Sequence, residues 1–198
     1  MGEIRSALDI ALEKTKEIVA DKSSLEADEF KKKGKKIISL FLDDPQATLD
    51  SCFKDIDKSK IALVKDGMFS ALSSNLVLAQ DQIAIKRLKR LEIGFLKLIE
   101  GSKKTKLIFE QLEGFFSEYI EGRKQIREQL GIQYGPRLKK KTEALAKQLG
   151  TNVHVDPESD PEFLQILRQN YAQFDERYNT IIAQVKDELK TMFEQANK

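Results

Sequence analysis

Apolar residues near the end of the chain recur with the period of an α-helix. Between Asp160 and Asn197 they follow one another at steps of three or four positions, which places them on one face of a helix. This stripe consists of Leu167, Tyr171, Phe174, Tyr178, Ile181, Val185, Leu189 and Met192. The near-heptad spacing predicts one long, coiled-coil-like helix of roughly 57 Å, whose apolar face needs a partner from its own chain or from another.

The beginning of the chain also shows helical periodicity, interrupted by start signals. Residues 3–21 are predicted to form a first helix, and Ser23 with Glu26 has the spacing of a capping box that opens a second one. Asp44 followed by Pro45 predicts a further helix start, because Asp is a good N-cap acceptor and Pro fits the first helical turn.

Residues 58–78 fit two structures. A helix is favoured by the spacing of Ile61, Val64, Met68 and Leu72. However, this region also contains two short apolar runs of strand length, which periodicity alone cannot distinguish from a buried helix. We predict a helix that breaks at residues 73–75, with a hairpin over residues 60–80 as the alternative.

Three helices are predicted in the second half, before the final one, over residues 81–100, 103–130 and 138–149. The segment 131–136 is expected to break the chain between the last two, because it contains two glycines and a proline. Gly150 is typical of the position just after a helix. Residues 150–160 then form a non-helical connection, and Asp160 with Pro161 begins the final helix.

Together these elements predict an all-α fold, an elongated bundle of about six helices with a long C-terminal helix. We expect a single helical domain over residues 1–198. It could subdivide into N-terminal helices over residues 1–100 and a long helical pair over residues 101–198. The alternative fold class is α+β, with the hairpin described above.

The composition is typical of helical proteins with a large solvent-exposed surface. Charged residues make up 33% of it, and there are only four prolines. The single cysteine, Cys52, allows no internal disulfide, and the N-terminus carries no apolar signal segment. The longest uncharged run, Gly67 to Gln80, has 14 residues, whereas a bilayer-spanning helix takes about 20. We therefore expect a cytoplasmic protein without a transmembrane segment.

No pattern in the sequence is typical of a catalytic, cofactor or metal site. His154 is the only histidine, which excludes metal motifs that need two. The carboxylates from Asp156 to Glu162 lack the glycine and glutamate that a calcium loop requires at its sixth and twelfth positions. Cys52 falls on an apolar face and is predicted to be a core residue. We predict no catalytic residue, no cofactor, no metal and no small-molecule substrate.

Charge is distributed unevenly along the chain. Residues 86–106 and 123–147 each carry eight basic and two acidic residues, whereas residues 151–198 carry five basic and nine acidic ones. The acidic last helix could pack along the basic ones. Alternatively, the basic residues could bind phosphates of a nucleic acid or an anionic surface. The candidate anion-binding residues are Lys86, Arg87, Lys89, Arg90, Arg123, Lys124, Lys139, Lys140 and Lys141.

Three functional hypotheses remain open at this point. The first is a non-enzymatic interaction or assembly protein that self-associates or binds a protein partner through the apolar stripe of the final helix, called the seam below. Its partner-seam residues are Leu167, Tyr171, Phe174, Tyr178, Ile181 and Val185. The second is a nucleic-acid or anionic-surface binder, and the third is an enzyme with a carboxylate-based site inside the bundle, for which the sequence nominates no residues.

Overall fold

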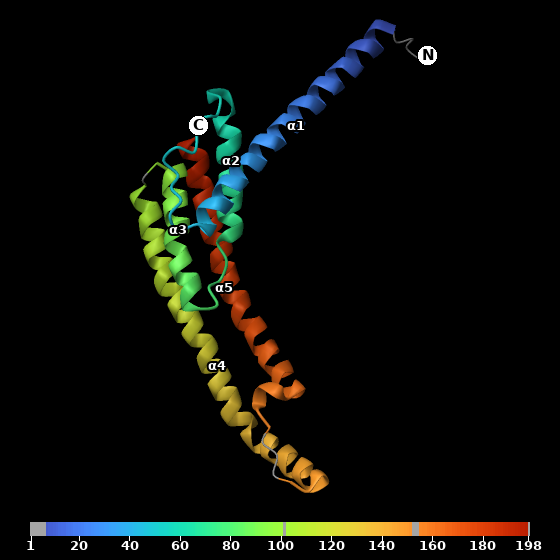
Figure 1. The fold of residues 1–198 in the computed structure, drawn as a ribbon, viewed down its shortest axis with the longest axis vertical. Coiled ribbons are helices and arrows are strands. Elements are labelled where there is room, and N and C mark those ends of the chain that lie inside the picture. The colour runs from blue at the N-terminus through green and yellow to red at the C-terminus, as the bar shows by residue number, and fades with distance from the viewer. Residues whose placement is uncertain (1–6, 101, 152–154, 198) are drawn as a thin grey trace. The chain divides into compact units, whose positions relative to one another are not determined.

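A computed structural model describes residues 7–100, 102–151 and 155–197 (Figure 1). Over these residues it contains five α-helices, two 3-10 helices and no strand. In chain order these are α1 (Ala7–Asp43), η1 (Lys58–Lys60), α2 (Ile61–Asn75), α3 (Gln82–Leu98), α4 (Lys103–Leu149), η2 (Pro157–Ser159) and α5 (Pro161–Ala196). The all-α prediction is confirmed, with five α-helices where about six were expected. The alternative hairpin over residues 60–80 is wrong, because α2 occupies most of that segment.

The chain divides into two compact units, each made of segments that are distant in sequence. Unit 1 comprises the described residues of Met1–Asn75, Arg90–Ser102 and Met192–Lys198. Unit 2 comprises Leu76–Lys89 and the described residues of Lys103–Thr191. None of the helices in the described part of the chain is both long and apolar enough to cross a membrane.

Unit 1 is built on a close crossing of α1 and α2. Gly34 of α1 lies against the backbone of Val64, and Gly67 of α2 lies against the backbone of Lys31. A Cβ atom at either glycine would overlap the facing carbonyl oxygen, so only glycine allows the two helices to approach this closely. The crossing is surrounded by the fully buried side chains of Ile38, Val64, Met68 and Leu72.

The capping box at Ser23 and Glu26 does not start a new helix, since α1 runs without a break from Ala7 to Asp43. Good helix formers dominate the sequence before Ser23, so helical structure can continue through a motif that elsewhere marks a start. The two helices predicted there are therefore one. The predicted cap at Asp81 is confirmed, because its carboxylate accepts a 2.8 Å hydrogen bond from the N–H of Ala84.

The helix predicted to begin at Asp44 and Pro45 is absent, and residues 44–57 form successive turns instead. Arg90 explains this difference. Its guanidinium lies 3.8 Å from the Phe41 ring and donates hydrogen bonds to the carbonyl oxygens of Phe41, Asp44 and Ala47. A helix over this segment would need the Asp44 and Ala47 carbonyls for its own ladder. In the turns Arg90 bonds both carbonyls, and that of Asp44 also accepts the N–H of Ala47. The positive charge of Arg90 also stabilises the negative C-terminal end of α1.

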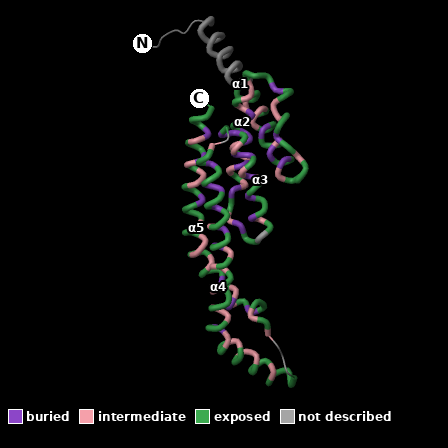
Figure 2. Tube along the Cα trace, turned by 90° about the vertical axis from the view of Figure 1, so that its left-hand side faces the viewer, coloured by how far each residue is buried: buried purple, intermediate pink, exposed green. Residues whose placement is uncertain are grey.

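Unit 2 consists mainly of α4 and α5, which run antiparallel beside each other (Figures 1 and 2). α4 continues through residues 131–136, with Pro136 inside the helix, so the predicted break is wrong. Contacts of Tyr134, described below, hold this segment against α5 and override its weak helical propensity. Gly150 follows α4 with a φ of +64°, which confirms the predicted helix end.

Candidate functional site

An aromatic ladder joins α4 to the middle of α5. The ring of Tyr119 stacks on Phe174 with centroids 5.6 Å apart and lies 5.0 Å from Tyr178, which also packs 4.7 Å from Phe115. Gly122 of α4 leaves the space that the Phe174 ring occupies. The apolar stripe of α5 therefore has its partner within the chain over this region.

The two ends of the predicted seam differ. Leu167 is buried in a cluster with Tyr134 and Phe163, whereas Ile181 is 42% exposed and Val185 is half-buried. The residue that points inward there is Ile182, which is 4% exposed. A straight helix has 3.6 residues per turn, so a heptad stripe drifts around it and the buried face moves by one position.

Arg123 of α4 was predicted to bind anions, but it belongs to a polar cluster between α4 and α5. Its guanidinium is 4.0 Å from the ring of Tyr171 and donates a 3.0 Å hydrogen bond to the hydroxyl of Tyr119. That hydroxyl donates to Asp175 at 2.7 Å. Burial and the bond to Asp175 raise the pKa of Tyr119 to about 12. Arg123 thus bonds groups of its own unit.

Lys141 is the centre of a second cluster, where α5 begins. Its ammonium donates to Asp160 at 2.7 Å, to Glu162 at 2.9 Å and to the hydroxyl of Tyr134 at 2.8 Å. Asp160 is only 5% exposed and also accepts the N–H of Glu162, as the predicted helix start requires. Arg137 adds an ion pair to Glu162 at 2.5 Å.

The charges of this cluster stabilise one another. Hydrogen bonds from Lys141 hold the pKa values of Asp160 and Glu162 below their usual range, and the same bonds raise the pKa of Lys141. Burial is the main cause that raises the pKa of Tyr134. At neutral pH the lysine stays cationic and the carboxylates stay ionised, so these groups form ion pairs and offer neither a nucleophilic amine nor a general acid.

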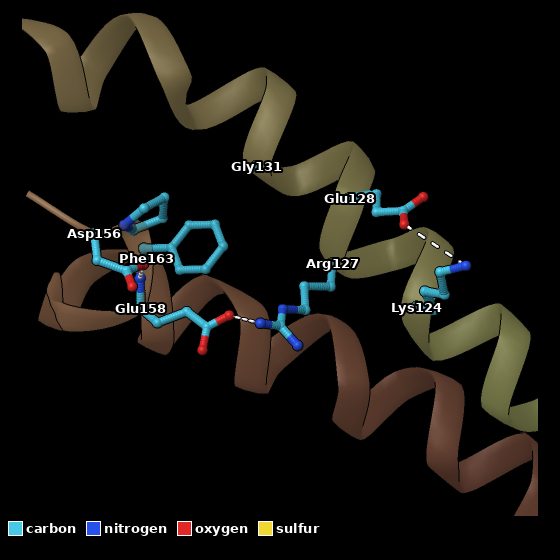
Figure 3. Close-up of a pocket in the computed structure, with 8 residues that line it drawn as sticks. Lys124, Arg127, Glu128, Gly131, Asp156, Glu158 and Phe163 are labelled. Carbon is cyan, nitrogen blue, oxygen red and sulfur yellow. Dashed lines mark hydrogen bonds and ion pairs between the residues drawn. The ribbon is translucent and has the colours of Figure 1, made fainter. Parts of the chain in front are cut away.

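A hollow of about 500 Å³ lies beside this cluster, between α4, η2 and the start of α5 (Figure 3). Its polar lining is already paired: Arg127 reaches across to Glu158, Lys124 contacts Glu128 at 4.0 Å, and Asp156 accepts the N–H of Glu158. Phe163 forms its apolar wall. The volume would suit a small molecule, but the charged groups already bond one another, so we assign no ligand to the hollow.

Beyond Lys141 the end of α4 is exposed. Figure 2 shows this end mostly green and pink, with few buried positions. The side chains of Leu145 and Leu149 are 39% and 64% exposed, and Lys147 is exposed as well. Lys139 and Lys140, which precede Lys141, are also exposed. None of the three lysines has an ion-pair partner among the residues that the structure describes. This end combines apolar surface with positive charge.

The candidate anion-binding residues thus divide into two groups. Arg90, Arg123 and Lys141 bond to carbonyls, hydroxyls or carboxylates within their own units. The others are exposed: Lys86, Arg87, Lys89, Lys124, Lys139 and Lys140. Sequence reasoning did not identify Tyr134, although it lies seven positions before Lys141 and therefore on the same helical face.

Of the remaining candidates, the structure describes Cys52. Burial raises the pKa of the Cys52 thiol, which is half-buried. His154 lies outside the described residues. Within the described ranges, no group of three His, Cys, Asp or Glu side chains is placed to hold a metal ion.

Comparison with known proteins identifies one family. Residues 51–191 match a family of unknown function, DUF6657, over most of the chain. The search of curated proteins gave no match. The search of solved structures gave none either.

Proposed function

The chain belongs to the DUF6657 family of unknown function, and we propose that it acts without catalysis, as a helical interaction protein. The observation that carries this proposal is the end of α4, residues 142–149. Among the described residues, Lys141 is the last one of α4 that bonds the start of α5; the helix continues beyond it and exposes Leu145 and Leu149. Leu145 and Leu149 lie four positions apart and therefore on the same face of the helix, and apolar groups that are exposed together are typical of a contact surface.

The polar clusters of unit 2 support a structural role in preference to a catalytic one. Lys141, Asp160 and Tyr134 bond one another, and Tyr119 bonds both Arg123 and Asp175. A catalytic acid or base must exchange its proton with a substrate, so it needs access and a pKa near the working pH. The pKa values of Lys141, Tyr134 and Tyr119 are raised and that of Asp160 is lowered, which moves all four away from neutral pH. The bonds of both clusters instead fix α4 against α5.

The chemistry of the exposed end favours a partner other than a second copy. Lys139, Lys140 and Lys147 outnumber the one nearby acid, Glu143, so two such ends would repel each other. Self-association through the middle of the seam would first require α5 to leave α4. We therefore expect a protein partner whose surface is apolar and acidic.

Site-specific photo-crosslinking in the native cells tests this proposal. A photoreactive amino acid replaces Leu149, and the control carries it at Gln111, an exposed position of α4 far from the end. We expect one discrete cross-linked protein from position 149 and none from position 111, with mass spectrometry identifying it. A cross-link to a second copy would support self-association instead. The absence of any species, or the same species from both positions, would contradict the proposal.

Nucleic-acid binding is the second candidate, because the exposed lysines on α3 and α4 could contact phosphates. It predicts retardation of RNA or DNA at low salt that is lost steeply as salt rises. Replacing Lys139 and Lys140 with Gln would then weaken binding. Absence of retardation at low salt would exclude this candidate, and the chain's lack of tryptophan makes bound nucleic acid easy to detect at 260 nm.

A further inference from the structure

The middle of α4 contains a segment that is weak as a helix. Gly131 and Gly135 lie in open space, because a Cβ atom at either would meet nothing within 4 Å. Packing therefore does not require glycine at these positions. Pro136 has no N–H to donate, so the carbonyl of Ile132 loses its helical partner. Such a segment bends more easily than the helix on either side of it.

Bonds to the start of α5 hold the part of α4 beyond this segment. Arg137 and Lys141 form ion pairs with Glu162 at 2.5 and 2.9 Å, and Lys141 pairs with Asp160 at 2.7 Å. The hydroxyl of Tyr134 lies 3.1 Å from the carboxylates of both Asp160 and Glu162. Each of these bonds joins α4 to the first residues of α5 or to its cap.

We infer that residues 131–136 form a hinge in α4 and that the ion cluster is the latch that keeps its outer arm, residues 137–149, against the start of α5. Lys141 is the main part of this latch. It contacts both carboxylates, and without it Asp160 would be a buried charge with no cation. Opening the latch lets the arm swing while the aromatic ladder keeps the rest of α4 against α5.

Opening would also uncover apolar surface. Tyr134, Phe163 and Leu167 are 4%, 2% and 8% exposed, and Leu138 of the arm packs against this cluster. When the arm moves, it takes Leu138 away and leaves the Phe163 side of the cluster open to water or to a partner. The latch thus connects the charges at the cap of α5 with the accessibility of an apolar cluster.

Hydrogen exchange measured by mass spectrometry on the purified full chain tests the hinge and the latch. We compare Lys141→Met with Lys140→Met, which removes an exposed lysine of the same arm. Lys141→Met should speed exchange in residues 137–149 by about tenfold and leave residues 105–125 unchanged, because only the arm opens. Lys140→Met should behave like the wild type. Unchanged exchange in the arm, or an equal rise over both segments, would overturn the inference.

Two further measurements keep the test decisive if Lys141→Met folds poorly. In the wild-type chain, high salt should speed exchange in the arm but not in residues 105–125, since salt screens the ion pairs. Replacing Gly131 and Gly135 with Ala should reduce that rise, because both added Cβ atoms enter open space and stiffen the helix. An equal rise with the two alanines would contradict the hinge. These measurements need no partner, so their outcome is separate from the cross-linking test.

Discussion

Arg90 provides the most direct test of whether a basic residue serves the fold or an external ligand. Its guanidinium nitrogens donate to the carbonyls of Asp44 at 2.8 Å, Ala47 at 3.1 Å and Pro45 at 3.3 Å, and also to Phe41. Arg90→Met keeps much of the apolar stem and removes these donors. The turns after α1 then lose the group that holds them together.

The magnitude follows from the burial of the acceptors. Asp44 and Pro45 are exposed, so water can replace Arg90 there, whereas Phe41 is buried and Ala47 is half-buried. A hydrogen bond to a charged group contributes about 1.5–3 kcal/mol, and the stacking on the Phe41 ring adds about 1 kcal/mol. The bonds to Phe41, Asp44 and Ala47 all come from one guanidinium nitrogen, which has two hydrogens to share among them. Counting one full bond to a shielded carbonyl together with the ring contact, we expect a loss of about 2.5–4 kcal/mol.

Urea unfolding followed by circular dichroism at 222 nm measures this loss. The matched control is Lys89→Met, an exposed neighbour on the same helix, which should stay within about 0.5 kcal/mol of the wild type. Arg90→Lys should fall between them, because an ammonium cannot reach several carbonyls as a planar guanidinium does. A stable Arg90→Met chain with weakened anion binding would refute the structural role and restore Arg90 to the anion-binding residues.

Gly67→Ala should lower the free energy of unfolding by about 1–3 kcal/mol in the same urea assay, because its Cβ would overlap the Lys31 carbonyl. Gly114→Ala, whose Cβ enters open space, should raise it by up to about 1 kcal/mol. Equal effects of the two substitutions would contradict the close crossing of α1 and α2. Because the pKa of Tyr119 is raised to about 12, its stabilisation is complete below pH 10 and is lost as pH rises towards 12; Tyr119→Phe should remove this part of the alkaline loss in pH-dependent unfolding. Phe174→Asp should lower the melting temperature, since it places a carboxylate in the aromatic ladder, and unchanged melting would argue against the ladder.

Local sequence signals predicted the structure correctly where the tertiary contacts of a segment favour the same conformation as its own sequence. The final helix begins at Pro161 as predicted, because Asp160 is both a good cap by type and a bonded one in the structure. The turns over residues 44–57 could not be predicted in this way. Their carbonyls bond Arg90, which lies 43 or more positions away in sequence, and no local pattern reveals that contact.

The unbroken α4 is the opposite case, in which tertiary contacts keep a helix that the local sequence disfavours. The sequence of residues 131–136 costs a helix roughly 5 kcal/mol relative to alanine, counting two glycines and one proline. Local reasoning therefore predicts a break. The structure keeps the helix because Tyr134 packs on Phe163 at 5.5 Å and ion pairs hold the residues that follow. A segment whose local and tertiary preferences conflict is where a hinge is expected.

The uneven distribution of charge along the sequence indicated which segments form ion pairs, but not which of their basic residues are paired. The basic stretches and the acidic last segment do pair, through Lys104 with Glu188, Arg123 with Asp175 and Lys141 with Asp160. Charge counts cannot separate a cation that pairs within the chain from one that faces water, because both contribute equally to the sum. Burial and hydrogen bonding make that separation, and they leave Lys139 and Lys140 facing water. An external partner of this protein is therefore best sought at the end of α4, where the chain's own carboxylates no longer reach.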